Sequence, residues 1–252
     1  MADVPTPGPR RQLSAKALKE LVREGWNQRS WTYRPSVRGG DGTGHVRREY
    51  REWLTPILRS LAPGSAVLDL GCGSGIPTSQ LLSRKFRVTG VDISDVQVER
   101  ARQLVPTATF LREDMSEVRF PAASFGAVVS LYSIIHVPLA EQRPLFRRIR
   151  RWLAPGGWFL SVLGSSRWRG LERGWLGSES WMYWDHEAAD TYRRWLESDG
   201  FTVLEHRFVP EGDGGHEMFL ARKRSGPVRA TPRSSGSAPP ASRRSRPPKG
   251  SR

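Results

Sequence analysis

A short apolar run followed by a loop with glycine at alternate positions is the stretch of this 252-residue chain best suited to bind a small ligand. Residues 67–70 read Val-Leu-Asp-Leu, and glycine then occupies positions 71, 73 and 75 ahead of Pro77. This order predicts a strand, a tight turn and a helix N-terminus, which present backbone N–H groups and a positive helix end to a ligand. Glycine suits the turn because it adopts positive φ values and admits a ligand close to the backbone.

The spacing of these glycines separates two kinds of cofactor. A dinucleotide-binding loop reads G-x-G-x-x-G, and its third glycine lets the helix pack closely beside a pyrophosphate. Counted from Gly71, that position holds Ile76, and the third glycine is Gly75 instead. The loop therefore reads D-x-G-x-G-x-G from Asp69, which departs from the dinucleotide pattern.

Acidic residues follow the next two predicted strands. Asp92 stands 21 residues beyond Gly71, after a strand predicted over 86–91, where a carboxylate is placed to bind both hydroxyls of a ribose. An NAD-binding fold uses an acidic residue in the same way, so Asp92 does not distinguish the two cofactors. Asp114 follows a third strand predicted over 108–111.

With these motifs in this order, the chain resembles the class I S-adenosylmethionine-dependent methyltransferases over roughly residues 45–222. The resemblance implies S-adenosyl-L-methionine as cofactor, with the glycine loop under its methionine part and Asp69 near the charged methionine end. It also implies that Asp114 accepts a hydrogen bond from the adenine amino group while the Met115 N–H meets a ring nitrogen. The sequence departs from the family at Gly126, because Phe-Asp is usual there. The implied cofactor-binding residues are Asp69, Gly71, Cys72, Gly73, Gly75, Asp92, Ile93, Asp114, Met115 and Leu131.

The segment after the fourth predicted strand holds the candidate catalytic residue. Residues 125–135 are the most apolar run of the chain and predict a strand buried on both faces. His136 follows, and because histidine titrates near neutral pH it is a candidate general base. The alternative is that His136 packs over the cofactor or bonds a loop carbonyl. The segment lacks the Asn/Asp-Pro-Pro-aromatic and Pro-Cys sequences that resemble nucleobase methylases, and we expect no metal because no carboxylates cluster after the fourth and fifth strands.

A tryptophan-rich insertion over residues 164–184 is the most individual feature of the sequence. Aromatic residues on a loop above the expected cofactor favour a hydrophobic or aromatic small-molecule pocket. The alternative is that the tryptophans only fasten a long loop to the core. A glycine-rich segment over 39–44 indicates a second, N-terminal flap. The candidate residues of the substrate pocket are Trp31, Tyr33, Tyr132, Trp181 and Tyr183.

The surrounding pattern predicts an α/β fold with a doubly wound, mostly parallel sheet. Five strands alternate with helices from residue 62 onward, and two closing strands over 201–208 and 217–221 predict an antiparallel hairpin. A helix is expected from Ser14 to about Trp26. Ser94, with Gln97 three residues on, is expected to cap the helix after the second strand, and Asp185 to cap a helix ending near Ser198. We expect disorder over 1–12, N-terminal helices and a flap over 13–61, a cofactor-binding domain over 62–223, and a disordered basic tail over 224–252.

The charge distribution limits what the net charge of +15 implies. Ten Lys and Arg residues and no acidic residue lie in 222–252, so much of the basicity belongs to the tail. The single cysteine indicates a reducing cytoplasm, and no apolar run is long enough for a signal peptide or a membrane span. The sequence thus favours a cytoplasmic methyltransferase acting on O, N or S of a small molecule. An RNA or protein acceptor, reached through the arginine-rich helix over 139–153 and the tail, and a non-catalytic binding module or NAD-type oxidoreductase stay open.

Overall fold

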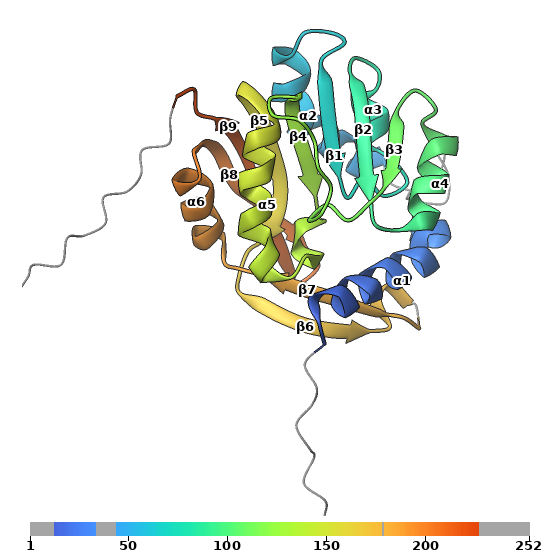
Figure 1. Ribbon diagram of the computed structural model, residues 1–252. Helices are drawn as coiled ribbons and strands as arrows, with labels where there is room; N and C mark the ends of the chain where they lie inside the picture. The colour runs from blue at the N-terminus through green and yellow to red at the C-terminus, as the bar shows by residue number, and fades with distance from the viewer. Residues whose placement is uncertain (1–12, 34–43, 178, 227–252) are drawn as a thin grey trace, which may run out of the picture.

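A computed structural model of the protein describes residues 13–33, 44–177 and 179–226. A seven-stranded sheet with the order β3-β2-β1-β4-β5-β9-β8 runs through its centre (Figure 1). The strands are β1 (Ala66–Leu70), β2 (Arg87–Asp92), β3 (Thr109–Arg112), β4 (Phe125–Leu131), β5 (Leu153–Gly164), β8 (Phe201–Glu211) and β9 (Gly214–Lys223). β1 to β5 pair in parallel and β9 pairs antiparallel with β5 and β8, which confirms the doubly wound sheet with a closing hairpin.

Helices cover both faces of this sheet. α5 and α6 pack on one face, and α2 and α3 pack on the other. Each face of the sheet has its own apolar core. Burial on both faces explains why the β4 run is apolar throughout instead of alternating. The helices are α2 (Gly44–Ser60), α3 (Thr78–Leu82), α4 (Asp95–Leu104), η1 (Ile134–His136), α5 (Leu139–Trp152) and α6 (Ala189–Ser198).

Two predicted helix starts have different outcomes. Ser94 caps α4 as predicted, because its Oγ accepts a hydrogen bond from the Gln97 N–H at 3.1 Å. The prediction that Asp185 caps the next helix is wrong. Asp185 lies inside a strand, and α6 begins after Ala188, whose side chain makes no capping bond.

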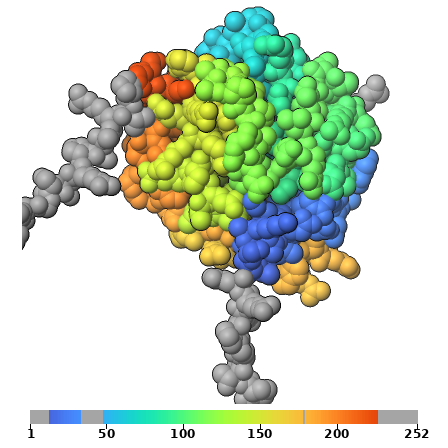
Figure 2. Space-filling view, in the orientation of Figure 1, coloured from blue at the N-terminus to red at the C-terminus, as the bar shows by residue number. Residues whose placement is uncertain are grey.

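The tryptophan-rich insertion forms a separate two-stranded sheet. β6 (Trp168–Arg173) and β7 (Trp181–His186) pair antiparallel, and the short η2 (Trp175–Gly177) lies between them. The N-terminal helix α1 (Ala15–Tyr33) packs against β7 below the carboxyl ends of the parallel strands (Figures 1 and 2). α1 continues past the predicted end near Trp26, so Trp31 and Tyr33 belong to a helix rather than to a flap. The glycine-rich part of the predicted flap and the tail from residue 227 lie outside the described residues.

Buried polar contacts hold α1 over this edge. Lys19 forms an ion pair with Asp114 and bonds Glu141 at 3.0 Å. Burial alone would lower the pKa of the Lys19 ammonium, but these carboxylates outweigh it and raise the pKa. Further along the helix, Ser30 donates to the Gln97 side chain at 2.8 Å. No helix in the described part of the chain carries the length of apolar sequence needed to cross a membrane.

Replacing Gly25 by valine should loosen α1 from the hairpin. A Cβ at Gly25 would lie 2.9 Å from the Met182 Cε and 3.1 Å from the Trp181 carbonyl oxygen, so a larger side chain must push the two elements apart. We expect a loss of about 1–3 kcal/mol in the free energy of unfolding, measured by urea denaturation. Gln28→Val on the exposed side of the same helix is the control, and an equal loss in both variants would contradict this packing.

Candidate functional site

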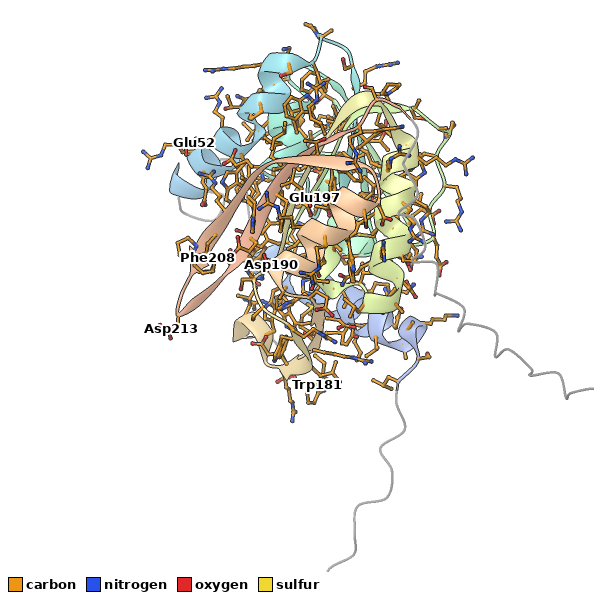
Figure 3. All side chains as sticks on the ribbon, turned by 90° about the vertical axis from the view of Figure 1, so that its left-hand side faces the viewer. Glu52, Trp181, Asp190, Glu197, Phe208 and Asp213 are labelled. Atoms are coloured by element: carbon orange, nitrogen blue, oxygen red, sulfur yellow. The ribbon has the colours of Figure 1, made fainter. Side chains whose placement is uncertain are left out.

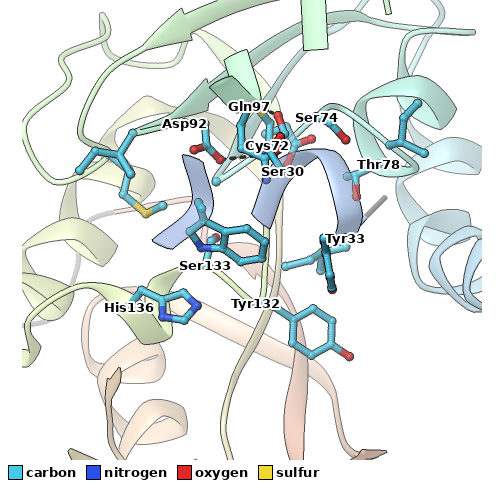
Figure 4. Close-up of a pocket in the computed structure, with 18 of the residues that line it drawn as sticks. Ser30, Tyr33, Cys72, Ser74, Thr78, Asp92, Gln97, Tyr132, Ser133 and His136 are labelled. Atoms are coloured by element: carbon cyan, nitrogen blue, oxygen red, sulfur yellow. Dashed lines mark hydrogen bonds between the residues drawn. The ribbon is translucent and has the colours of Figure 1, made fainter. Parts of the chain in front are cut away.

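A pocket opens at the carboxyl ends of β1, β2 and β4, where the strand order reverses and ligands of doubly wound folds bind. Its empty volume, counted with the part open to solvent, is about 840 Å³. The glycine loop and the end of β2 form one side, the segment after β4 forms the opposite side, and α1 supplies a third wall. Figure 4 shows Asp92 and Cys72 facing His136 and Tyr132 across this space.

The glycine loop has the close-approach geometry that its sequence predicts. The N–H groups of Gly71 and Cys72 both donate to the Val91 carbonyl, at 2.7 and 3.1 Å, and so tie the loop to β2. Gly71 has φ +68°, and a Cβ there would lie 2.1 Å from the Ser133 Cβ. Gly73 has φ +54° and borders the pocket, where the nearest atoms to an added Cβ are 3.9 Å away. The space beside Gly73 is therefore free for a ligand.

Asp92 is held rigidly between two backbone groups. Its Oδ2 accepts from the Gly73 N–H at 2.8 Å and its Oδ1 from the Ser94 N–H at 2.9 Å. Burial raises the pKa of this carboxyl to about 6, against the lowering effect of these hydrogen bonds. Each oxygen keeps lone pairs for a ligand in the pocket, so a vicinal diol could donate one hydrogen bond to each.

Asp69 is the second carboxylate of the pocket wall. Burial raises its pKa to about 7, and the charge of Asp92 adds to this, while the Ser79 hydroxyl bonded to Oδ2 at 2.6 Å lowers it. A carboxylate in such a place gains from a cation beside it, because a positive charge favours the ionised form. The arrangement fits a ligand with a charged amino group.

Met115 and Asp114 have different surroundings. Met115 borders the pocket, as do Ile93 and Leu131. The Asp114 side chain instead pairs with Lys19 of α1, and its Oδ1 accepts from the Ser116 N–H and Oγ at 2.7 and 2.8 Å. Asp114 is not one of the residues lining the pocket, so its contact with an adenine stays a prediction.

His136 borders the pocket and is anchored by one ring nitrogen. Its Nδ1 lies 2.8 Å from the Tyr183 carbonyl oxygen. A carbonyl only accepts, so Nδ1 carries the proton and the neutral ring keeps a lone pair on Nε2. Burial lowers the pKa of His136 to about 4, and the ring packs against Trp184 with 4.3 Å between centroids.

The candidate substrate residues divide into two groups. Tyr33 and Tyr132 line the pocket. Trp31 does not line the pocket; it is 58% exposed, and its ring packs against the Arg100 guanidinium. Trp181 is 42% exposed at the outer end of the hairpin (Figure 3).

Tyr183 lies outside the pocket lining as well. It is buried, and its hydroxyl donates to Asp185 at 2.7 Å. It contributes to the site through its backbone carbonyl, on which His136 rests.

The sequence reasoning missed two aromatic residues of the pocket wall. Trp26 comes from α1 and Tyr50 from α2. Tyr50 was recognisable as part of an apolar helix face, but nothing local indicated that this face reaches the site. Tyr132 itself has φ +57°, an unusual value for a residue with a side chain. Among the described residues, no group of three or more His, Cys, Asp or Glu could hold a metal ion.

The fold is a doubly wound α/β sheet with a pocket at its switch point, and comparison with known proteins shows what the chain is similar to. Residues 67–157 match a family model described as "Methyltransferase domain". The chain is 39% identical over 105 residues to 2-methyl-6-phytyl-1,4-hydroquinone methyltransferase of Synechocystis, covering 40% of this chain and 32% of that protein. It is 26% identical over 201 residues to human eEF1A lysine and N-terminal methyltransferase, covering 71% and 29%.

A solved structure shows that the similarity of fold covers most of the chain. The 1,6-didemethyltoxoflavin-N1-methyltransferase of Burkholderia thailandensis has a TM-score of 0.62 at 19% identity, over 89% of this chain and 94% of that one. The chain spans about a third of the length of the two curated relatives. The matched domain over residues 67–157 and this fold together support a class I S-adenosylmethionine-dependent methyltransferase.

The buried Asp69 carboxyl should make stability depend on pH. Because its pKa is raised from 3.8 to about 7, the folded state keeps a proton between these pH values that the unfolded state has lost. Its contribution to stability is fully present below 3.8 and is lost as pH rises through 7. The free energy of unfolding of the wild type, relative to Asp69→Asn, should fall by roughly 2–3 kcal/mol from about pH 5 to about pH 8. The difference between the two proteins isolates Asp69 from the histidines. A difference that stays flat with pH would show that Asp69 is already ionised at about pH 5.

Proposed function

We propose that the protein transfers the methyl group of S-adenosyl-L-methionine to an O, N or S atom of a small, hydrophobic or aromatic molecule. The observation that carries this proposal is the composition of a single pocket. Its glycine-loop side offers open backbone and two buried carboxylates, and its opposite side offers aromatic rings and a neutral histidine. A methyl donor and a flat acceptor would thus meet inside one enclosure.

The residues of the first side suit the parts of the cofactor. The open space beside Gly73 suits the methionine part, and Asp69 suits its amino group. The two fixed oxygens of Asp92 suit the ribose hydroxyls. When bound, the cofactor supplies a methyl group already activated on a positively charged sulfur. We assign cofactor contacts to Asp69, Gly71, Cys72, Gly73, Gly75, Asp92, Ile93, Met115 and Leu131, with Asp114 reaching the adenine only after a change in its pairing with Lys19.

The acceptor side supports catalysis by positioning. Trp26 and Tyr33 of α1, with Tyr50 and Tyr132, enclose an apolar space. Aromatic faces also stabilise a nearby cation such as a sulfonium. Holding the acceptor in line with the methyl group and excluding water would supply most of the rate enhancement.

Calorimetry with the full chain tests the cofactor. We expect S-adenosylhomocysteine to bind and NAD not to bind, because position 76 holds Ile instead of the third glycine that lets the helix pack closely in a dinucleotide-binding loop. Binding of NAD alone would overturn the proposal in favour of an oxidoreductase. Binding of S-adenosylhomocysteine without any methyl transfer from labelled cofactor to metabolite, RNA or protein fractions would indicate a non-catalytic binding module.

Replacing Asp92 by alanine should weaken cofactor binding strongly. The change removes two charge-assisted hydrogen bonds to the ribose, each worth about 1.5–3 kcal/mol, so the dissociation constant for S-adenosylhomocysteine should rise by roughly 100-fold or more. Asp213→Ala, at the exposed tip between β8 and β9, is the matched control. An unchanged affinity in Asp92→Ala would show that the ribose lies elsewhere.

An RNA or protein acceptor is the second candidate. It is supported by the arginines of α5 and by the human relative named for protein substrates. Removing residues 227–252, which are basic, should leave turnover of a small-molecule acceptor unchanged and reduce methylation of an RNA fraction, measured with labelled cofactor. Loss of small-molecule turnover would contradict a purely local site.

We further propose a cytoplasmic location, supported by the single, free and buried Cys72.

A further inference from the structure

His136 is held in one tautomer by a backbone group that cannot reverse its role. The Tyr183 carbonyl requires a proton on Nδ1, so the Nε2 lone pair is left for the pocket that the ring borders. A neutral imidazole with this orientation is a proton acceptor and not a donor. Figure 4 shows the ring facing the pocket from the side opposite Asp92.

The carbonyl that fixes His136 is itself held by a buried network. The Tyr183 hydroxyl and the Leu139 N–H both donate to Asp185 Oδ2, at 2.7 and 2.9 Å. The Gln142 side chain donates to the carbonyls of Val137, at 2.7 Å, and Asp185, at 2.5 Å. β7 is thereby locked to the start of α5 and to the segment after β4, so the Tyr183 carbonyl cannot turn away from the imidazole.

The surroundings of His136 keep the acceptor site uncharged. α1 presents Trp26 to the ring and β7 presents Trp184. The titratable groups whose charges act on it are His186 of β7 and His216 of β9, both of which oppose protonation. The carboxylates that line the pocket are Asp69 in β1 and Asp92 at the end of β2, and Figure 4 shows Asp92 across the pocket from His136. Among the described residues that line the pocket, a cationic acceptor would therefore find no carboxylate on the His136 side, because Glu211 lies behind the lining, bonded to Tyr132 and His216.

We propose that His136 accepts the proton of an acceptor hydroxyl, and that the protein is an O-methyltransferase for a flat, uncharged, phenol-type molecule. This inference rests on the proposed methyl transfer. The acceptor O–H bond breaks, its proton goes to Nε2, and its electron pair forms the new O–CH3 bond. The electrons of the old S–CH3 bond stay on sulfur, so the sulfonium becomes a neutral thioether and His136 becomes imidazolium until it releases the proton to water.

The chemistry of the acceptor atom distinguishes oxygen from nitrogen. A neutral amine attacks with its own lone pair and loses its proton afterwards, so it gains little from a fixed base. A hydroxyl oxygen is a poor nucleophile until its proton is removed. A positioned base typically accelerates such a reaction by about 100- to 10,000-fold. A pinned, neutral imidazole is of use chiefly to an oxygen acceptor.

Nuclear magnetic resonance of the nitrogen-15-labelled full chain tests the tautomer without turnover. His136→Asn, whose amide can still donate to the Tyr183 carbonyl, assigns the signals by their disappearance. We expect His136 to show a protonated Nδ1 and an unprotonated Nε2 from about pH 6 to about pH 8. A proton on Nε2 at neutral pH would overturn the proposal and leave the calorimetric test of the cofactor unaffected.

Methyl transfer to two phenols and one aniline tests the role in catalysis. With 4-methoxyphenol, His136→Asn should lower kcat by roughly 100-fold with little change in KM, the lower end for a positioned base because the pKa of His136 lies below the operating pH. With 4-nitrophenol, which is largely ionised near pH 8, the loss should be much smaller, and with 4-methoxyaniline it should be slight. His206→Asn, on β8 and stacked on Phe219, is the control.

The outcomes separate the inference from the proposed function. Equal losses with both phenols would mean that His136 only packs the pocket. Transfer to the aniline but to neither phenol, or to none of the three while S-adenosylhomocysteine binds, would overturn the oxygen acceptor and leave the cofactor assignment in place.

Discussion

One buried carboxylate connects the parts of this site. Asp92 bonds the Gly73 N–H with one oxygen and the Ser94 N–H with the other, so it fixes the glycine loop after β1 against the start of α4. Ser94 in turn donates to the Asn27 side chain of α1 at 2.6 Å. The same carboxylate that faces the ligand thus sets the position of the helix that closes the pocket. Burial of this group is unfavourable for its charge, and the backbone bonds offset part of that cost.

A cluster of charged side chains, together with apolar packing, stabilises the position of α1. Lys19 is buried among Asp114, Ser116 and Glu141. Removing one partner from such a cluster leaves another charge without compensation, so its members are strongly coupled. Asp114 is shared between this cluster and the cofactor role that the family resemblance implies. In the proposed complex, Asp114 would therefore link cofactor binding to the seating of α1.

The sequence predicted most of the fold because its signals were local. The alternating strands and helices, the Ser94 cap and the closing hairpin each depend on residues close together in the chain. The aromatic wall of the pocket depends on contacts between elements that are distant in the chain. The ring centroids of Trp26 in α1 and Trp175 in the insertion, for example, lie 4.7 Å apart. Periodicity showed that α1 is a helix but not which side meets the pocket, so Trp31 was assigned to the site and Trp26 was not. Asp185 failed as a helix cap for the same reason, because its bonds to Tyr183 and Leu139 place it in a strand.

The tryptophan-rich insertion does more than cover the pocket, because it orients a side chain that borders the pocket. In a doubly wound fold the parallel strands place the glycine loop and Asp92 without help from the loops beyond β5. His136 is different, because its orientation depends on a carbonyl in β7, which belongs to the insertion. The core of the fold thus positions the glycine loop and Asp92 on one side of the pocket. The β6–β7 hairpin fixes the orientation and tautomer of His136 on the other side. A change in the hairpin could alter the acceptor chemistry and leave the cofactor side intact, which is how one fold hosts many reactions.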